Sequence, residues 1–512
     1  MTIPRLDIQA SSKPVLRAFF LALLAFVVGK AAAAEYEAGL IQVQLNPGHT
    51  ISEVNAAYNT VVVDSLPPLY LLQVPTGQDD DALLVQMETE LGDTFFCVEH
   101  SWRNETPEGT RQMVVAAVGG TITDYLDQRL AQRLHLAEAH TQATGSGVVV
   151  AVLDTGVMTD HEVFGGAILP GGYDFIDNDA DPSDLANEVD DDADGLPDEG
   201  AGHGTLVAGI IHLVAPDAMI LPVRVLDDEG RGSTFTVAKG IRYAVAQGAD
   251  IINLSLGLTV HSGIIAHELA AARLAAVAMV SAAGNLGVDS VQFYPASDIK
   301  VLMVAALDSS DVKAPFSNYH AKVAVSAPGV GIYGPFYDGA YAIGAGTSFA
   351  TPFVTGECAL LWSLEPWLNC DQLYYRATQG VVNIYSIPEN QPYIAKLGTG
   401  RFDGLQMLLT SPLLTGVMPV VQRGAEARVV PNPVSAGGRM TLAWSAASPP
   451  GPVCLFVHDA SGRQVRRLSI NGTDGFVFTA LDDAGRPLPP GTYFVRVTGS
   501  RTRQSARMVV VR

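Results

Sequence analysis

Basic residues and cysteine are scarce in this sequence. Lysine and arginine together number 31 against 53 acidic residues, which gives a net charge of −22 over 512 residues. A nucleic-acid-binding protein needs a basic footprint, so this balance excludes a nucleic-acid partner, and the acidity favours solubility and cation binding instead. The four cysteines are too few and too scattered for a disulfide framework, and they lack the close pairs of a zinc site. They are Cys97, Cys358, Cys370 and Cys454, and a Cys358–Cys370 disulfide is left open.

Long apolar runs are also scarce. One run, Ala18–Gly29, follows a basic start and precedes the small residues Ala31–Ala34. A membrane-spanning helix needs about 20 apolar residues, and this run is too short for one. The pattern is typical of a cleaved signal peptide, which we predict over residues 1–34. We therefore expect a secreted, extracellular protein without a transmembrane anchor, and leave open its attachment to the cell surface.

Charged residues make up 16% of the chain and hydrophobic residues 48%, beside 50 glycines and 30 prolines. This composition is typical of a compact, turn-rich protein. The length predicts about three folded units. We expect an α+β unit over residues 35–110, a large unit over 120–412, a linker over 413–426 and an all-β sandwich over 427–512.

The large central unit alternates apolar, β-branched runs with helical patterns. Such alternation predicts a mostly parallel, doubly wound α/β sheet with helices on both faces. The expected strands are Val148–Leu153, Ile220–Leu226, Ile251–Leu254, Val277–Ala282 and Val301–Ala306.

Three short motifs in this unit carry residues suited to nucleophilic catalysis. Asp154 follows the first expected strand, His203 lies in Gly-His-Gly-Thr before a helix, and Ser348 lies in Gly-Thr-Ser at the start of another helix. A serine hydroxyl needs a base, histidine is the natural base near neutral pH, and a buried carboxylate orients the imidazole. The backbone N–H of Ser348 at a helix start and the amide of Asn285, after Ala282–Gly284, could hold an oxyanion. Each motif alone is also typical of a turn or a helix cap.

The order Asp, His, Ser, with Ala-Ala-Gly-Asn between the last two, distinguishes the sequence from chymotrypsin-like and α/β-hydrolase orders. The segments VAVLDTGV, GHGTLVAGII, AAGN and GTSFATPFVTG resemble the signature stretches of the subtilisin-like serine proteases, the subtilases, and the resemblance runs from Val148 to about Leu409. It implies a monomeric serine endopeptidase acting on polypeptides. One departure is Leu206, where the family usually has a second histidine, and we expect altered packing there.

The resemblance also implies the role of each site residue. Asp154 orients His203, His203 is base and then acid, Ser348 is the nucleophile, and Asn285 stabilises the oxyanion. A peptide substrate would pair as an added strand with Ser255, Leu256 and Gly257. The primary side-chain pocket would be lined by Ala282, Ala283 and Gly284.

An acidic insertion precedes His203. Its carboxylates alternate as in the first nine positions of an EF-hand loop, with Gly195 at the sharp turn, although Ala201 replaces the final glutamate. We predict a structural Ca²⁺ here, against the alternative of a solvated acidic loop. The ligands would be Asp190, Asp192, Asp194, Leu196 (through its carbonyl) and Asp198.

The flanking units carry weaker resemblances. Residues 35–110 resemble the subtilase propeptide, which would occupy the substrate groove until self-cleavage between Trp102 and Ala131; the alternative is a permanent N-terminal domain. Residues 427–512 look like an immunoglobulin-like module of the hook-capping or type IX sorting kind, and the alternative is a spacer.

Two other functions compete with the protease. The first is a non-catalytic binding protein, against which stands the presence of all three triad residues. The second is a serine esterase, against which stands the absence of the G-x-S-x-G motif of α/β-hydrolases.

Overall fold

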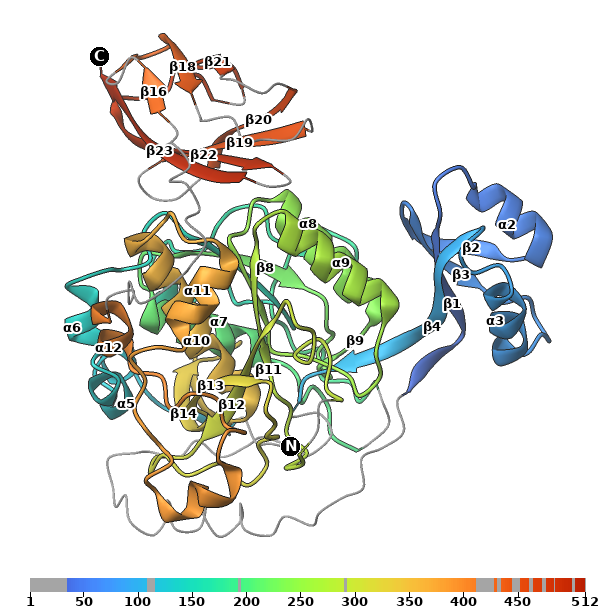
Figure 1. The fold of residues 1–512 in the computed structure, drawn as a ribbon, viewed down its shortest axis with the longest axis horizontal. Helices are drawn as coiled ribbons and strands as arrows, with labels where there is room; N and C mark the ends of the chain where they lie inside the picture. The colour runs from blue at the N-terminus through green and yellow to red at the C-terminus, as the bar shows by residue number, and fades with distance from the viewer. Residues whose placement is uncertain are drawn as a thin grey trace, which may run out of the picture.

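A computed structural model describes three folded units (Figure 1). The described residues are 35–107, 116–191, 195–289, 292–410, 428–430, 434–443, 452–459, 464–471, 476–482, 484–499 and 502–511. The predicted signal peptide and the predicted linker lie outside these residues. No helix within the described ranges is long and apolar enough to cross a membrane.

The central unit is built on a seven-stranded sheet with the order β13-β12-β11-β10-β6-β8-β7. All neighbouring strands in it run parallel, as the alternation of strands and helices predicts. The strands are β6 (Val149–Asp154), β7 (Tyr173–Asp174), β8 (Met219–Arg224), β10 (Ile251–Leu254), β11 (Ala278–Ala282), β12 (Leu302–Leu307) and β13 (Val323–Pro328). The five expected strands are therefore present, each within two residues of its predicted ends.

Helices cover both faces of this sheet because successive side chains of each strand point to opposite faces. Val150 and Val152 share one buried cluster with α7 (His203–Val214) and α10 (Thr347–Leu364), whereas Ala151 and Leu153 share another with α8 (Thr234–Ala246) and α9 (Gly263–Leu274). The smaller helices are α4 (Ile122–Leu126), α5 (Arg129–Arg133), α6 (Leu136–His140), α11 (Cys370–Ala377) and α12 (Gly404–Leu409), with 3-10 turns at Glu162–Phe164 and Pro388–Tyr393. A second sheet has the order β14 (Val330–Pro335), β15 (Tyr341–Ala345), β5 (Ala116–Val118).

The N-terminal unit is an antiparallel sheet with two helices, and one of its strands continues into the central unit. Its elements are β1 (Tyr36–Leu45), α2 (Ile51–Tyr58), β2 (Val61–Leu66), β3 (Leu69–Gln73), α3 (Asp80–Glu88) and β4 (Phe95–Glu105). The sheet order is β2-β3-β1-β4-β9, in which β9 (Arg231–Ser233) belongs to the central unit. Figure 1 shows the light-blue β4 leaving the small unit and reaching β9.

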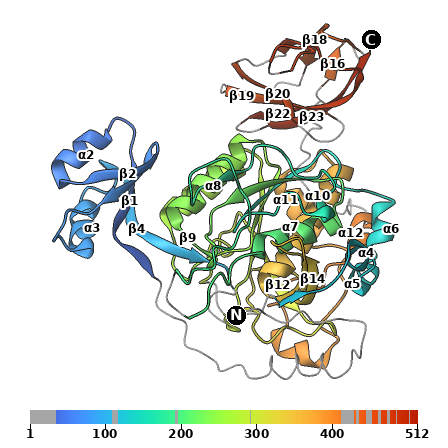
Figure 2. The ribbon, with the colours of Figure 1, turned by 180° about the vertical axis from the view of Figure 1, so that it is seen from behind.

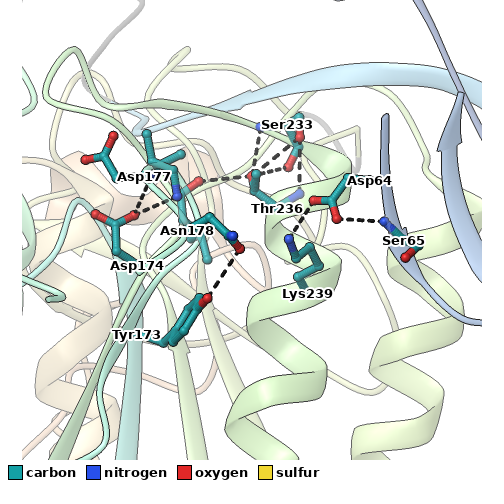
Figure 3. Close-up of polar contacts among 11 residues, drawn as sticks. Asp64, Ser65, Tyr173, Asp174, Asp177, Asn178, Ser233, Thr236 and Lys239 are labelled. Carbon is teal, nitrogen blue, oxygen red and sulfur yellow. Dashed lines mark hydrogen bonds and ion pairs between the residues drawn. The ribbon is translucent and has the colours of Figure 1, made fainter. Parts of the chain in front are cut away.

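The N-terminal unit also packs on the two outer helices. Leu69 and Leu71 share a buried cluster with Phe235 of α8 and Ile264 of α9. At the edge of this contact Lys239 of α8 donates from Nζ to Asp64 Oδ2, 2.6 Å away. Figure 3 shows these two side chains meeting beside the start of α8, where Ser233 and Thr236 form the helix cap.

Glu99 of β4 adds a polar link between the N-terminal unit and α9. Its Oε2 accepts the backbone N–H of Gly263 at 2.8 Å, and its other oxygen accepts the hydroxyl of Ser262. A carboxylate at this position caps the N-terminus of α9, where backbone N–H groups lack partners within the helix.

The C-terminal unit consists of two sheets that share one apolar core. One sheet has the order β16-β18-β21 and the other β17-β23-β22-β19-β20. The strands are β16 (Arg428–Val430), β17 (Val434–Ser435), β18 (Arg439–Ala443), β19 (Pro452–Asp459), β20 (Gln464–Asn471), β21 (Phe476–Thr479), β22 (Gly491–Gly499) and β23 (Thr502–Val511). The regular elements of this unit are therefore all strands in the described residues. Figure 2, seen from behind, shows it on a different side of the central unit from the N-terminal unit.

The structure answers one question that the sequence left open. Cys358 and Cys370 are both buried, and both are free thiols, so the disulfide left open above is not formed. Leu206, the departure from the family pattern, is fully buried and lies next to Gly334 of β14.

Candidate active site

Asp154 and His203 lie in direct contact at the end of the central sheet. Asp154 is the last residue of β6 and is fully buried. Its Oδ1 lies 2.6 Å from His203 Nδ1 and also accepts the backbone N–H of Thr155 at 2.8 Å. Because Nδ1 faces the carboxylate, the other ring nitrogen of His203, Nε2, is the one that can act as a base.

Glycines on either side of His203 make this contact possible. Gly202 precedes α7 with φ of 85°, a left-handed conformation, and a Cβ there would lie 2.1 Å from the Phe336 ring. A Cβ on Gly204 would lie 3.0 Å from Asp154 Cβ and 2.1 Å from the carbonyl oxygen of Gly156. A side chain at Gly204 would push the start of α7 away from the end of β6, and one at Gly202 would be strained by its φ and would collide with Phe336.

Ser348 is the second residue of α10, and it is fully buried. Its neighbour Phe349 places the start of α10 beside His203, since the two ring centroids are 5.1 Å apart. Pro352 lies inside α10, and the helix continues through it. Proline has no N–H to bond the carbonyl four residues earlier, which is that of Ser348. The hydroxyl of Ser255 donates to this carbonyl oxygen at 2.8 Å instead.

Asn285 lies after β11 and is tied to the same helix. Its Oδ1 accepts both the backbone N–H of Thr347, at 2.9 Å, and the Thr347 hydroxyl, at 2.8 Å. The backbone N–H can only donate, so the amide oxygen must face Thr347 and the NH₂ group points the other way. This orientation fixes the Asn285 amide beside the start of α10.

The segment after β10 has a peptide strand bound to it. Gly257 and Glu105 exchange two backbone hydrogen bonds, of 2.9 and 3.1 Å, in an antiparallel bridge. The N–H of Thr106 donates to the carbonyl of Gly230 at 2.9 Å, and Arg103–Glu105 pair with β9. The end of β4 is thus held between two segments of the central unit as an added strand.

Comparison with known proteins decides the family. Residues 145–382 match the family model described as "Subtilase family". Over 242 residues the chain is 40% identical to thermitase of Thermoactinomyces vulgaris, an alignment that covers 45% of this chain and 81% of thermitase. The chain belongs to the subtilase family. It is a subtilisin-like serine endopeptidase, whose substrates are polypeptides.

Two further similarities extend this result. Subtilisin BL of Lederbergia lenta is 35% identical over 268 residues, which is 49% of this chain and 92% of that protein. The crystal structure of fervidolysin from Fervidobacterium pennivorans has a TM-score of 0.62 at 23% identity, and covers 94% of this chain and 77% of fervidolysin. The second similarity concerns the fold alone.

Asp184 supports the histidine of this subtilase, and the sequence analysis missed it. The residue is buried, and its Oδ1 accepts the N–H of Gly202 at 2.9 Å and the hydroxyl of Thr155 at 3.1 Å. Its Oδ2 accepts the N–H and the hydroxyl of Thr205, at 3.0 and 2.7 Å. One carboxylate therefore joins the start of α7 to the turn after β6. Burial raises the pKa of Asp184 to about 6, although these hydrogen bonds oppose the shift.

The predicted calcium ligands are partly described. Asp190 Oδ2 accepts the N–H of Gly195, and the two oxygens of Asp198 accept the N–H groups of Asn187 and Glu188, each at 2.8 Å. Asp192 and Asp194 lie outside the described residues. Among the residues that are described, no three acidic, histidine or cysteine side chains converge on one point suited to a metal ion.

Two further acidic residues lie near this loop. Asp228 lies against Asp198, and burial together with this contact raises the pKa of Asp228 to about 6. Glu229 is buried too, and its Oε2 has no hydrogen-bond partner in the described part of the chain. Its other oxygen, Oε1, accepts the backbone N–H of Asp191 at 3.1 Å.

Proposed function

We propose that Asp154, His203 and Ser348 form the catalytic triad of this endopeptidase. The observation that carries the assignment is the 2.6 Å contact between Asp154 Oδ1 and His203 Nδ1 at a site where the start of α10 packs against the same imidazole. It leaves Nε2 of His203 to receive the hydroxyl proton of Ser348.

The proposed reaction has two halves. Ser348 Oγ bonds to the carbonyl carbon of the scissile peptide as its proton passes to His203. The C–N bond then breaks, the same proton goes to the departing amine, and an acyl-enzyme remains. Water attacks the ester in the same way and releases Ser348. Asn285 and the Ser348 N–H stabilise the oxyanion in both halves.

Ser348→Ala tests the nucleophile. Turnover of casein should fall about a million-fold, and labelling by a fluorophosphonate probe should disappear. Ser363→Ala, at the other end of α10, is the matched control and should keep both. A Ser348→Ala protein that still hydrolyses casein would refute the assignment. Asn285→Ala should lower kcat about 100- to 1,000-fold with little change in KM.

We further propose that residues 35–110 are an inhibitory propeptide and that residues 120–412 are the peptidase unit. The support is the strand pairing of Glu105 with Gly257, which occupies the predicted substrate edge at Ser255–Gly257. Since β4 and Thr106 are held in place, self-cleavage would follow Thr106, within the predicted interval that ends at Ala131. N-terminal sequencing of the matured protein tests this, and a mature chain that begins before residue 107 would contradict it.

We propose a structural Ca²⁺ at the loop of Asp190, Asp192, Asp194, Leu196 and Asp198. It would neutralise the carboxylates next to the start of α7 and so order the loop that precedes His203. Chelation with EDTA should lower the melting temperature of the Ser348→Ala protein, in which autolysis is absent. Asp198→Asn should remove the difference between the EDTA and Ca²⁺ samples. An unchanged melting curve would argue against the ion.

We also propose that residues 1–34 direct export, that the mature enzyme is a monomer, and that residues 427–512 are an immunoglobulin-like sorting or attachment module. The sandwich with its own apolar core supports an independent unit. Fractionation of cells that express either the full chain or a chain ending at residue 412 distinguishes a sorting role of residues 427–512 from a spacer role. Loss of export or of surface retention without residues 427–512 supports sorting, and unchanged distribution supports a spacer.

A further inference from the structure

The structure places an aromatic ring where the proposed site would receive a substrate side chain. The segment around Phe293 runs beside the substrate edge, because Tyr294 and Leu258 exchange two backbone hydrogen bonds of 2.8 Å in an antiparallel bridge. Leu258 directly follows Gly257, which holds Glu105. Phe293 is therefore fixed next to the strand that binds peptide.

The ring of Phe293 lies between two glycines of the substrate site. A Cβ added to Gly257 would lie 2.6 Å from ring atom Cε1, and a Cβ added to Gly284 would lie 2.9 Å from Cγ and Cδ2. Real Cβ atoms do not approach other atoms so closely, so the ring itself is in van der Waals contact with both α-carbons. Gly257 belongs to the predicted substrate edge, and Gly284 to the predicted lining of the primary pocket.

The ring is also held in this place from behind. Phe293 is 6% exposed and shares a buried cluster with Ala283, Ala296 and Met303. Its carbonyl oxygen accepts the N–H of Ser297 at 2.9 Å and the Ser297 hydroxyl at 2.8 Å. A side chain packed on one side and anchored through its own backbone cannot leave the slot without breaking these contacts.

We propose that Phe293 closes the primary side-chain pocket and restricts cleavage to peptide bonds that follow small residues such as glycine, alanine or serine. The inference rests on the proposed function, since it assumes that peptide binds along Ser255–Gly257 beside Ser348. The physical reason is volume, because the Phe293 ring fills the space between the backbones of Gly257 and Gly284 and leaves no room for a second ring. A hydrophobic pocket discriminates by about 10- to 200-fold for a single methylene group, so exclusion of a whole aromatic side chain is a large effect.

The experiment compares three peptide p-nitroanilides that differ only in the residue before the scissile bond, which is alanine, leucine or phenylalanine. With the matured full-length enzyme, kcat/KM should be at least about 100-fold higher for alanine than for phenylalanine. Phe293→Ala and Phe293→Gly should lower this ratio at least about 50-fold, mainly through a gain on the phenylalanine substrate. A misfolded variant cannot gain activity on the phenylalanine substrate. Phe293→Leu, which opens a smaller cavity, serves as the test if Phe293→Ala and Phe293→Gly do not fold.

Tyr294→Ala is the matched control. It removes the neighbouring ring, which lies against His261 at 5.2 Å between centroids, and it should leave the preference unchanged. A parent enzyme that cleaves after phenylalanine as readily as after alanine, or variants of Phe293 that keep the parent's ratio, would overturn the inference while the triad stands. Hydrolysis of none of the three peptides would contradict the proposed function and this inference together.

Discussion

The hydroxyl of Ser255 donates a hydrogen bond to the carbonyl oxygen of Ser348, 2.8 Å away. Asn253 Nδ2 donates in turn to Ser255 Oγ at 2.9 Å, and Thr355 donates to Asn253 Oδ1 at 2.7 Å. The relay begins and ends on α10 and passes through the end of β10. It satisfies the carbonyl that Pro352 leaves unbonded, and it ties the proposed nucleophile to the segment whose Gly257 pairs with Glu105.

Ser255→Ala should weaken this tie. The Ser348 carbonyl would stay buried without a donor, which costs about 1–3 kcal/mol of unfolding free energy. Urea denaturation of the Ser348→Ala protein, with and without Ser255→Ala, measures this loss. The Ser348→Ala change prevents autolysis and keeps the backbone carbonyl that Ser255 bonds. Ser310→Ala, an exposed serine-to-alanine change, should have no effect. A stability of Ser255→Ala equal to that of the control would show that the hydrogen bond adds nothing.

Asp184→Asn should lower activity while the fold is kept. An asparagine amide has one acceptor oxygen where the carboxylate has two. Its NH₂ group would therefore face donors, either those of Gly202 and Thr155 or those of Thr205. The start of α7 would shift, and a displacement of about 1 Å at a catalytic base costs about 100-fold in turnover. Steady-state kinetics checks this, with kcat expected to fall more than KM changes.

The matched control for this prediction is Asp181→Asn, in the same acidic stretch but exposed to solvent. Equal kinetics for the two variants would show that Asp184 has no special role in placing His203.

Glu357 should make the protein less stable as pH rises. It lies within α10, fully buried, and neither carboxyl oxygen has a hydrogen-bond partner among the described residues. Burial raises its pKa well above the usual value, reinforced by Asp403 and opposed by Arg376. The folded state therefore keeps a proton that the unfolded chain releases above about pH 4.3, so stability is greatest below that pH and falls as pH rises toward the folded-state pKa.

Denaturation of the Ser348→Ala protein at several pH values measures this effect. Within that window the parent should lose about 1.4 kcal/mol per pH unit relative to Glu357→Gln, which cannot ionise. Parallel pH profiles of the two proteins would show that Glu357 ionises normally in the folded state.

Asn104→Leu should make the N-terminal unit a stronger inhibitor. Asn104 is fully buried in β4 where it pairs with Gly232, and neither atom of its amide group has a partner in the described parts of the chain. An unsatisfied buried amide costs about 1–3 kcal/mol, which leucine would not incur. Activity should therefore appear about 5- to 100-fold more slowly when the full chain matures.

Gln86→Leu, an exposed change on α3, is the control and should mature like the parent. Maturation of Asn104→Leu at the parent's rate would indicate that β4 release does not limit activation.

The sequence by itself determined the type of fold and the chemistry of the site. The parallel strands were predictable because β-branched runs buried on both faces produce a strong local pattern, as in Val149–Asp154. Asp154, His203 and Ser348 were identifiable because each lies in a short motif next to a strand end or a helix start. These signals are local, and a single chain records them in consecutive residues.

Only the tertiary structure decided how these parts constrain one another. Asp184 lies 19 residues before His203 in the chain and within an acidic stretch, so nothing local marks it as the acceptor for the start of α7. Phe293 is an ordinary aromatic residue in the sequence, and its proposed role as a pocket wall depends on Gly257 and Gly284, which follow two different strands. Hydrogen bonding and packing between segments far apart depend on where the folded backbone brings them, and that information is spread over the whole chain.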